Sequence, residues 1–177
     1  MAADGFERSL LAAWTTNCRV TASLIGLVPA DLWSAAVPGI PTRTIRSIAA
    51  HLHNARCRWV KTLGGEHGVA VPARVDQRAV TRRELVTALR LSGRGIAAVL
   101  QLGCDRGGQV PPSKGYTWRN LALDVGHVLT YFVAHEAHHR GQIVMAARQL
   151  GRRLPATTTA GLWQWRTPRG QGGGSGR

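Results

Sequence analysis

Apolar residues recur every three or four positions in four long segments of the chain, and this periodicity predicts four amphipathic α-helices. We expect these helices over residues 6–27, 42–63, 81–103 and 124–150. The last segment shows the pattern most fully. Its stripe consists of Val128, Phe132, His135, His139, Ile143, Ala146 and Leu150.

Capping and turn residues mark the ends of these segments. Thr42 and Asp124 are suitable N-caps for the second and fourth helices, because short polar side chains accept hydrogen bonds from the first free backbone N–H groups. Thr-Arg-Arg-Glu over residues 81–84 forms a capping box at the start of the third helix. Proline and glycine are frequent in residues 29–41, which predicts a connector between the first two helices.

Four long helices without a clear strand pattern or an internal repeat predict an all-α protein, and a four-helix bundle is the natural architecture. The chain of 177 residues is long enough for one domain with its own core. We expect this domain to span residues 1–166. The tail over residues 167–177 is rich in Pro, Gly, Arg and Ser, and we expect it to be disordered.

The apolar stripe of the last helix contains two histidines at a metal-binding spacing. His135 and His139 lie one helical turn apart and present their imidazoles to the same point. Both fall on the face that should be buried, where adjacent imidazoles are costly unless each nitrogen has a partner. A bound metal ion supplies that partner, so we predict half of a divalent metal site.

The same stretch, His-Glu-Ala-His-His over residues 135–139, also matches the H-E-x-x-H pattern of zinc metalloproteases. Those enzymes take a further ligand downstream, but no His, Asp, Glu or Cys follows this stretch, which excludes that class. Any further protein ligand must come from upstream. His51 and His53 flank the second apolar stripe on opposite sides, and periodicity does not choose between them. His67 and His127 are more distant candidates.

Composition narrows the classes of function. The net charge of +14, with 23 Lys and Arg against 9 Asp and Glu, raises nucleic acid as a partner. The basic residues are spread along the chain and do not interleave with aromatics, so we disfavour nucleic-acid binding. No apolar run of about 18 residues is present, so we expect no membrane span. Three scattered cysteines indicate reduced thiols and a cytoplasmic location.

Several motifs resemble a known family. Thr-Ile-Arg-Ser-Ile-Ala-Ala-His over residues 44–51 resembles the first metal-ligand helix of the DinB-like, or DinB/YfiT, superfamily. The stretch over residues 135–143 resembles its second metal-binding helix, whose hallmark is His-x-x-x-His-Arg-Gly-Gln. Gly-Leu-Trp-Gln-Trp-Arg over residues 161–166 resembles a closing motif of some members. The likeness covers residues 6–166.

The resemblance implies a four-helix bundle with an up-down-down-up connection and one divalent metal ion, commonly zinc or nickel, held by three histidines. By motif these are His51, His135 and His139, so the resemblance favours His51 over His53. It also implies a homodimer and a small-molecule substrate. Members include thiol S-transferases that use a low-molecular-weight thiol (bacillithiol, mycothiol or glutathione) and proteins described as metal-dependent hydrolases.

Three imidazoles leave a position open for water or substrate, which is typical of catalytic metal sites. We therefore expect a metal-dependent thiol S-transferase or hydrolase. Glu136 is a candidate general base, as in H-E-x-x-H enzymes, or forms a salt bridge with Arg140 one turn on. The alternatives are a stress-associated metal-binding protein without turnover and a basic nucleic-acid-binding module. The roles of His53, His127 and His138 stay open.

Overall fold

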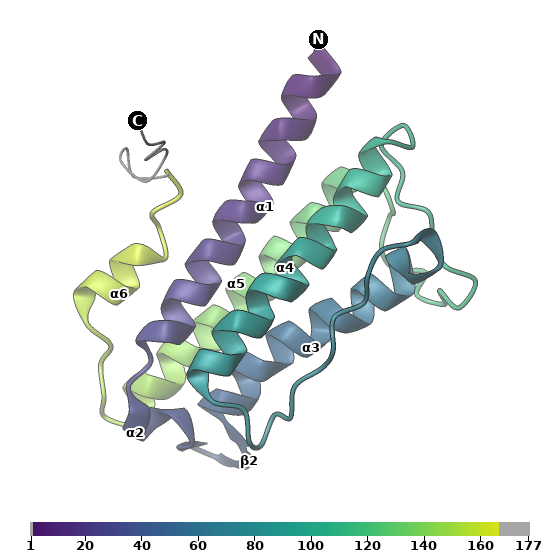
Figure 1. Cartoon of the computed structure of the whole chain (residues 1–177). Helices are drawn as coiled ribbons and strands as arrows, with labels where there is room; N and C mark the ends of the chain where they lie inside the picture. Colours follow the sequence, from purple (N-terminus) through teal and green to yellow (C-terminus); the bar gives the residue numbers. More distant parts are fainter. Residues whose placement is uncertain (1, 167–177) are drawn as a thin grey trace, which may run out of the picture.

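The computed structural model describes residues 2–166 and is mostly helical (Figure 1). Four long helices correspond to the four segments predicted from periodicity, so a helical protein is confirmed. They are α1 (Ala2–Leu27), α3 (Ile45–Gly64), α4 (Arg82–Cys104) and α5 (Val125–Gln149). The tail over residues 167–177, predicted to be disordered, lies outside the described residues.

The connector after α1 is more ordered than its sequence predicted. It contains a short helix, α2 (Ala30–Trp33), and an antiparallel hairpin of β1 (Ala36–Val37) and β2 (Ile40–Thr44). Gly39 turns the hairpin with a φ of 78°, which glycine adopts without steric cost. The strands are short and largely exposed, so they show no apolar alternation that would have predicted them. The remaining short elements are η1 (Gly65–His67) and α6 (Ala156–Gly161).

The helix caps follow the predicted chemistry with one shift. The N-cap of α3 is Thr44, whose side chain forms a reciprocal capping box with Ser47. The prediction at Thr42 was wrong because β2 continues through that residue to Thr44, so Thr42 lies within the hairpin and not at the start of the helix. The predicted capping box of α4 and the N-cap of α5 at Asp124 are both present.

The long helices lie side by side (Figure 1). α1 runs toward the end of the molecule that holds α2 and the hairpin, α3 and α4 both leave from that end, and α5 returns to it. α4 and α5 each pack against both α1 and α3. The four helices thereby enclose a common interior, and side chains from α3 and α5 can meet within it.

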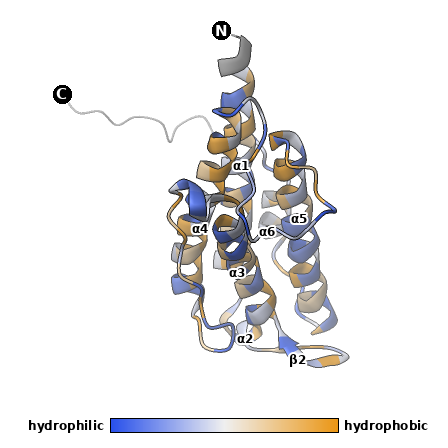
Figure 2. Cartoon of the chain, turned by 90° about the vertical axis from the view of Figure 1, so that its right-hand side faces the viewer, coloured by the Kyte–Doolittle hydropathy of each residue, from blue (hydrophilic) through white to orange (hydrophobic). Residues whose placement is uncertain are grey.

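Two groups of buried apolar side chains fill that interior. One includes Ile48 and Leu89 and extends to the hairpin end, and the other includes Trp14 and Phe132. Hydrophobic and hydrophilic residues alternate along the helices (Figure 2), as expected for helices with one face in a core. On α5 the buried face includes Val128, Phe132, His139 and Ile143.

The segment between η1 and α4 lies against α3. Nε2–H of His53 donates to the carbonyl of Ala73 at 2.8 Å. Asn54 exchanges two hydrogen bonds with the backbone of Val75, at 2.9 and 3.0 Å. These bonds satisfy backbone groups of a segment without regular structure. They hold it along α3, so α4 can begin at the same end of the molecule as α3.

One helix in the described part of the chain, α4, has a length and composition that would also suit a membrane crossing. In this fold 44% of the relevant window is buried, and α4 packs against α1 and α3. Its apolar face is therefore accounted for as part of the protein interior.

Candidate metal centre

Three histidines from two helices meet at one point. His51 lies on α3, whereas His135 and His139 lie one turn apart on α5. Their ligand atoms all lie within 4.8 Å of one another. The ring centroids of His51 and His139 are 4.7 Å apart, and those of His135 and His139 are 4.6 Å apart. We call these three residues the donor group.

The spacing of the donor group fits a divalent ion. The Nε2 atoms of His135 and His139 are 3.2 Å apart. Two imidazole nitrogens bound to one tetrahedral zinc ion would be about 3.3 Å apart. The described residues add no fourth His, Cys or carboxylate to the group. Imidazole suits zinc, nickel, copper and iron, so the donor atoms fit a metal ion without selecting one.

Gln142 fixes the orientation of His139. Its side-chain oxygen lies 2.8 Å from Nδ1 of His139, so Nδ1–H donates to it and Nε2 keeps a lone pair for the donor group. Arg43 of β2 donates to the same oxygen at 3.3 Å, and the side-chain nitrogen of Gln142 lies 2.9 Å from Nε2 of His138. Hydrogen bonds of this kind hold metal-binding histidines in one tautomer.

The surroundings keep the donor group uncharged. Burial, followed by the nearby His139 and His51, lowers the pKa of His135 to about 4. Burial is also the largest cause of the lowered pKa values of His51 and His139. Neutral imidazole is the form that binds metal ions. At neutral pH the donor group can therefore bind an ion without first losing protons.

His53, the other upstream candidate, faces α4 and the segment that precedes it. Its Nδ1 lies 3.0 Å from the hydroxyl of Ser92, and its Nε2 lies 2.8 Å from the carbonyl of Ala73. The thiol of Cys57 is 3.3 Å from Nε2. Both ring nitrogens thus have partners away from the donor group. Of the two histidines that periodicity left open, the structure brings His51 to the pair on α5.

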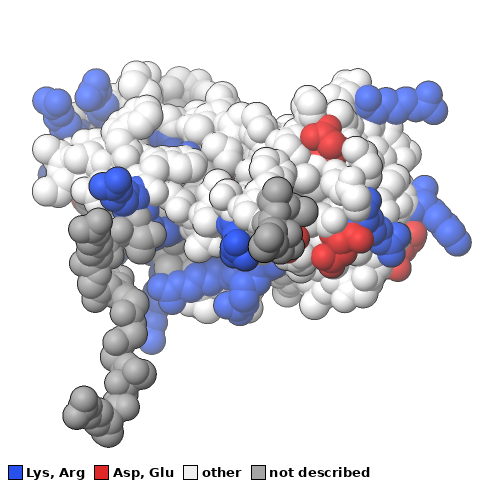
Figure 3. Space-filling model, turned by 90° about the horizontal axis from the view of Figure 1, so that it is seen from above, with Lys and Arg blue, Asp and Glu red and all other residues white. Residues whose placement is uncertain are grey.

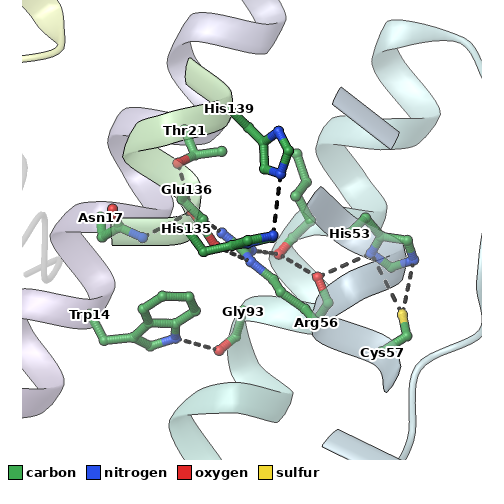
Figure 4. A network of polar contacts seen from close by, with 12 residues as sticks. Trp14, Asn17, Thr21, His53, Arg56, Cys57, Gly93, His135, Glu136 and His139 are labelled. Atoms are coloured by element: carbon green, nitrogen blue, oxygen red, sulfur yellow. Dashed lines mark hydrogen bonds and ion pairs between the residues drawn. The ribbon is translucent and has the colours of Figure 1, made fainter. Parts of the chain in front are cut away.

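Glu136 lies in the interior and forms a buried ion pair (Figure 4). Its carboxylate accepts from Nε and Nη2 of Arg56 at 2.6 and 2.8 Å, and from Asn17 and Thr21 of α1 at 2.9 and 2.7 Å. The predicted salt bridge with Arg140 is present but long, at 3.9 Å. The general-base role of Glu136 stays a prediction, and these contacts favour a structural role.

Arg56 is the main buried charge that sequence reasoning missed. Besides Glu136, it contacts the carbonyl of Leu89 at 2.9 Å, and its guanidinium lies 4.9 Å from the ring centroid of Trp14. The sequence did contain a signal, because Arg56 falls on the apolar stripe of α3 between Leu52 and Trp59. A charge at such a position requires a buried partner.

The other histidines lie outside the donor group. His127 is exposed in the first turn of α5 and sits 2.5 Å from the carboxylate of Asp124. His138 is exposed, and its ring lies 5.1 Å from that of His139. His67 belongs to η1. Of these three, His138 alone contacts the donor group, through the ring of His139 and through Gln142.

Fold and site together define a class of protein: a mostly helical fold that brings three neutral histidines together as a candidate metal centre. The sequence model of the DinB family matches residues 1–170, and the chain belongs to this family. The resemblance recognised in its motifs is thereby confirmed. No curated protein and no solved structure matches the chain.

Proposed function

We propose that this DinB-family protein binds one divalent metal ion, zinc or nickel, through His51, His135 and His139, and acts as a thiol S-transferase or a hydrolase. The observation that carries the proposal is the convergence of three imidazoles without a fourth protein donor among the described residues. Three protein ligands leave a coordination position for water or substrate, as in catalytic rather than structural zinc sites.

A divalent ion in this position supplies Lewis-acid chemistry, which lowers the pKa of a water molecule or thiol beside it. The chain supplies the geometry. The imidazoles hold the ion, and Gln142 keeps the proton of His139 on Nδ1. His51 and His135 are only half-buried, so a small molecule can approach the donor group from solvent.

We further propose that the long helices follow the up-down-down-up order of the family and that the chain forms a homodimer. The course of the helices in Figure 1 supports the first point, because α3 and α4 leave from the same end. Light scattering tests the second. A particle of twice the 19.1 kDa chain mass supports a dimer, and a particle of one chain mass contradicts it.

A small molecule is a better-supported partner than nucleic acid. Lys and Arg side chains lie in several separate places on the end of the molecule shown in Figure 3, and they do not form one stripe there. Phosphate backbones are bound most strongly by contiguous basic surfaces. The alternative that an experiment has to separate from the proposal is a metal-binding protein without turnover.

Metal content and activity measured on one preparation test the proposal. The protein is purified without chelators or a metal-affinity tag, and its metals are counted by elemental mass spectrometry. It is then assayed for transfer of bacillithiol, mycothiol and glutathione to an electrophile, and for ester and amide hydrolysis. We expect about one metal ion per chain and turnover that requires it.

The double variant His135→Ala His139→Ala should lose both the metal ion and turnover. His127→Ala, which changes an exposed histidine of the same helix, should keep both. Metal binding without turnover in any assay would contradict the proposed enzymatic activity and support a metal-binding protein without turnover. Absence of metal after reconstitution with zinc and nickel would contradict both.

A further inference from the structure

Two arginines near the donor group have no carboxylate partner among the described residues. Arg43 on β2 donates to Gln142, the hydrogen-bond partner of His139, and Arg58 lies two turns after His51 on α3. The carboxylate of Glu136 is neutralised by Arg56. Three neutral imidazoles would not cancel the charge of a divalent ion, so a ligand at this place should be an anion.

A cavity with aromatic walls lies beside Arg58. Its volume is about 350 Å³, and Trp59, Tyr116 and Trp118 line it. Trp118 is 42% exposed although its ring lies 4.9 Å from that of Trp59. Thr62, Thr117 and Arg58 add polar groups to this aromatic wall, and aromatic side chains with a few polar groups are the usual lining of a small-molecule site. The exposed part of the Trp118 ring can contact a flat apolar group.

Tyr131 connects this cavity to the donor group. Its ring centroid lies 5.4 Å from that of Trp118 and 5.9 Å from that of His135, on which it stacks at 16°. Tyr131 precedes His135 by one turn of α5, and Arg58 follows His51 by two turns of α3, or about 10 Å. α3 and α5 run in opposite directions (Figure 1), so Tyr131 and Arg58 lie on the same side of the donor group.

We propose that this cavity is a substrate subsite for a small anion with a flat apolar group, such as an aromatic carboxylate. The acid group pairs with Arg58, the flat group lies against Trp118, and the reacting group points past Tyr131 to the donor group. The inference rests on the proposed function, because the reacting group occupies the open coordination position. It adds the class of substrate, which the three histidines alone do not specify.

Three thiol probes separate the contributions of charge and ring. 4-Mercaptobenzoate carries a thiol, a ring and an acid, 4-mercaptobenzamide lacks the charge, and 3-mercaptopropionate lacks the ring. Their affinities for the zinc-loaded protein are measured by calorimetry and by quenching of tryptophan fluorescence. We expect the benzoate to bind about fivefold more tightly than the benzamide, since a solvent-exposed ion pair contributes up to about that factor. We also expect it to bind more tightly than the propionate.

Matched variants locate the subsite. Arg58→Gln should remove the advantage of the benzoate over the benzamide, whereas Arg83→Gln, the same change at an exposed position of α4, should preserve it. Trp118→Leu should weaken both aromatic probes and leave the propionate unchanged. Equal affinities of wild-type protein for benzoate and benzamide would overturn the inference. An effect of Arg83→Gln as large as that of Arg58→Gln would overturn it as well.

A metal-free arm separates failure of the subsite from failure of the proposed function. Elemental analysis first shows whether zinc or nickel has loaded, and a protein that binds neither ion fails the proposed function. Benzoate and benzamide, which lack the thiol, are then compared on the metal-free protein. A preference for benzoate that Arg58→Gln abolishes supports the subsite even in that case. No preference overturns it.

Discussion

Replacing Glu136 by Gln tests whether its carboxylate stabilises the fold or performs chemistry. The change removes a negative charge that four donors contact at 2.6–2.9 Å. It leaves the guanidinium of Arg56, which is 2% exposed, without a counter-ion. Removing one partner of a buried ion pair costs about 3–5 kcal/mol. At about 2–4 °C per kcal/mol for a chain of this size, Tm should fall by roughly 6–20 °C.

The measurements are thermal and urea unfolding followed by circular dichroism, together with metal content and turnover of the folded protein. We expect Glu136→Gln to lose stability by that amount and to keep its metal ion and its turnover per folded chain. The double variant Arg56→Met Glu136→Leu should recover part of the loss, because it no longer buries the unpaired guanidinium of Arg56, and Arg140 keeps its hydrogen bonds to Asn17 and Thr21. Lost turnover with stability changed by less than about 1 kcal/mol would refute this reasoning and make Glu136 the general base.

Two substitutions and the pH dependence of one thiol test other parts of the structure. Gln142→Leu removes the hydrogen-bond acceptor of Nδ1–H of His139. It should weaken zinc binding about 10–100-fold, measured by competition with a chelator. Unchanged affinity would contradict the role of Gln142 in orienting His139. Gly103→Ala would place a Cβ 2.5 Å from the side chain of Val125. It should lower the free energy of unfolding, measured in urea, by about 1–3 kcal/mol. An unchanged free energy would contradict this close packing of α4 against α5. Burial raises the pKa of Cys18 from 9.0 to about 11, so its alkylation rate should still be rising between those pH values, and a plateau below pH 9 would be inconsistent. The thiol of Cys18 loses its proton at lower pH in the unfolded chain than in the folded protein. The free energy of unfolding should therefore fall as the pH rises from 9 to 11.

Local chemistry explains which parts of the fold could be predicted. The long helices each bury one face, so their apolar periodicity is strong, and the cap at Asp124 depends on a neighbouring backbone N–H alone. The hairpin gave no such signal, because β1 and β2 are short and largely exposed. Because β2 continues to Thr44, the N-cap of α3 is Thr44 and not the predicted Thr42.

In the candidate site, too, features within one helix could be predicted, and contacts between helices could not. His135 and His139 are neighbours on one helix, so their spacing alone predicted a shared ligand position. The choice of His51 over His53 depends on how α3 is rotated against α5 and α4, which the periodicity of α3 does not determine; the family motif supplied it. The ion pair of Arg56 with Glu136 is a contact between distant segments and could not be derived from either helix alone.

Zinc binding by His51→Ala and His53→Ala, compared with wild type, tests most directly whether the donor group holds an ion. Circular dichroism first confirms that each variant is folded, and zinc affinity is then measured against a competing chelator. We predict about one zinc ion per wild-type chain, an affinity at least about 100-fold weaker in His51→Ala, and nearly unchanged affinity in His53→Ala. One zinc ion bound by His51→Ala with wild-type affinity would contradict the account.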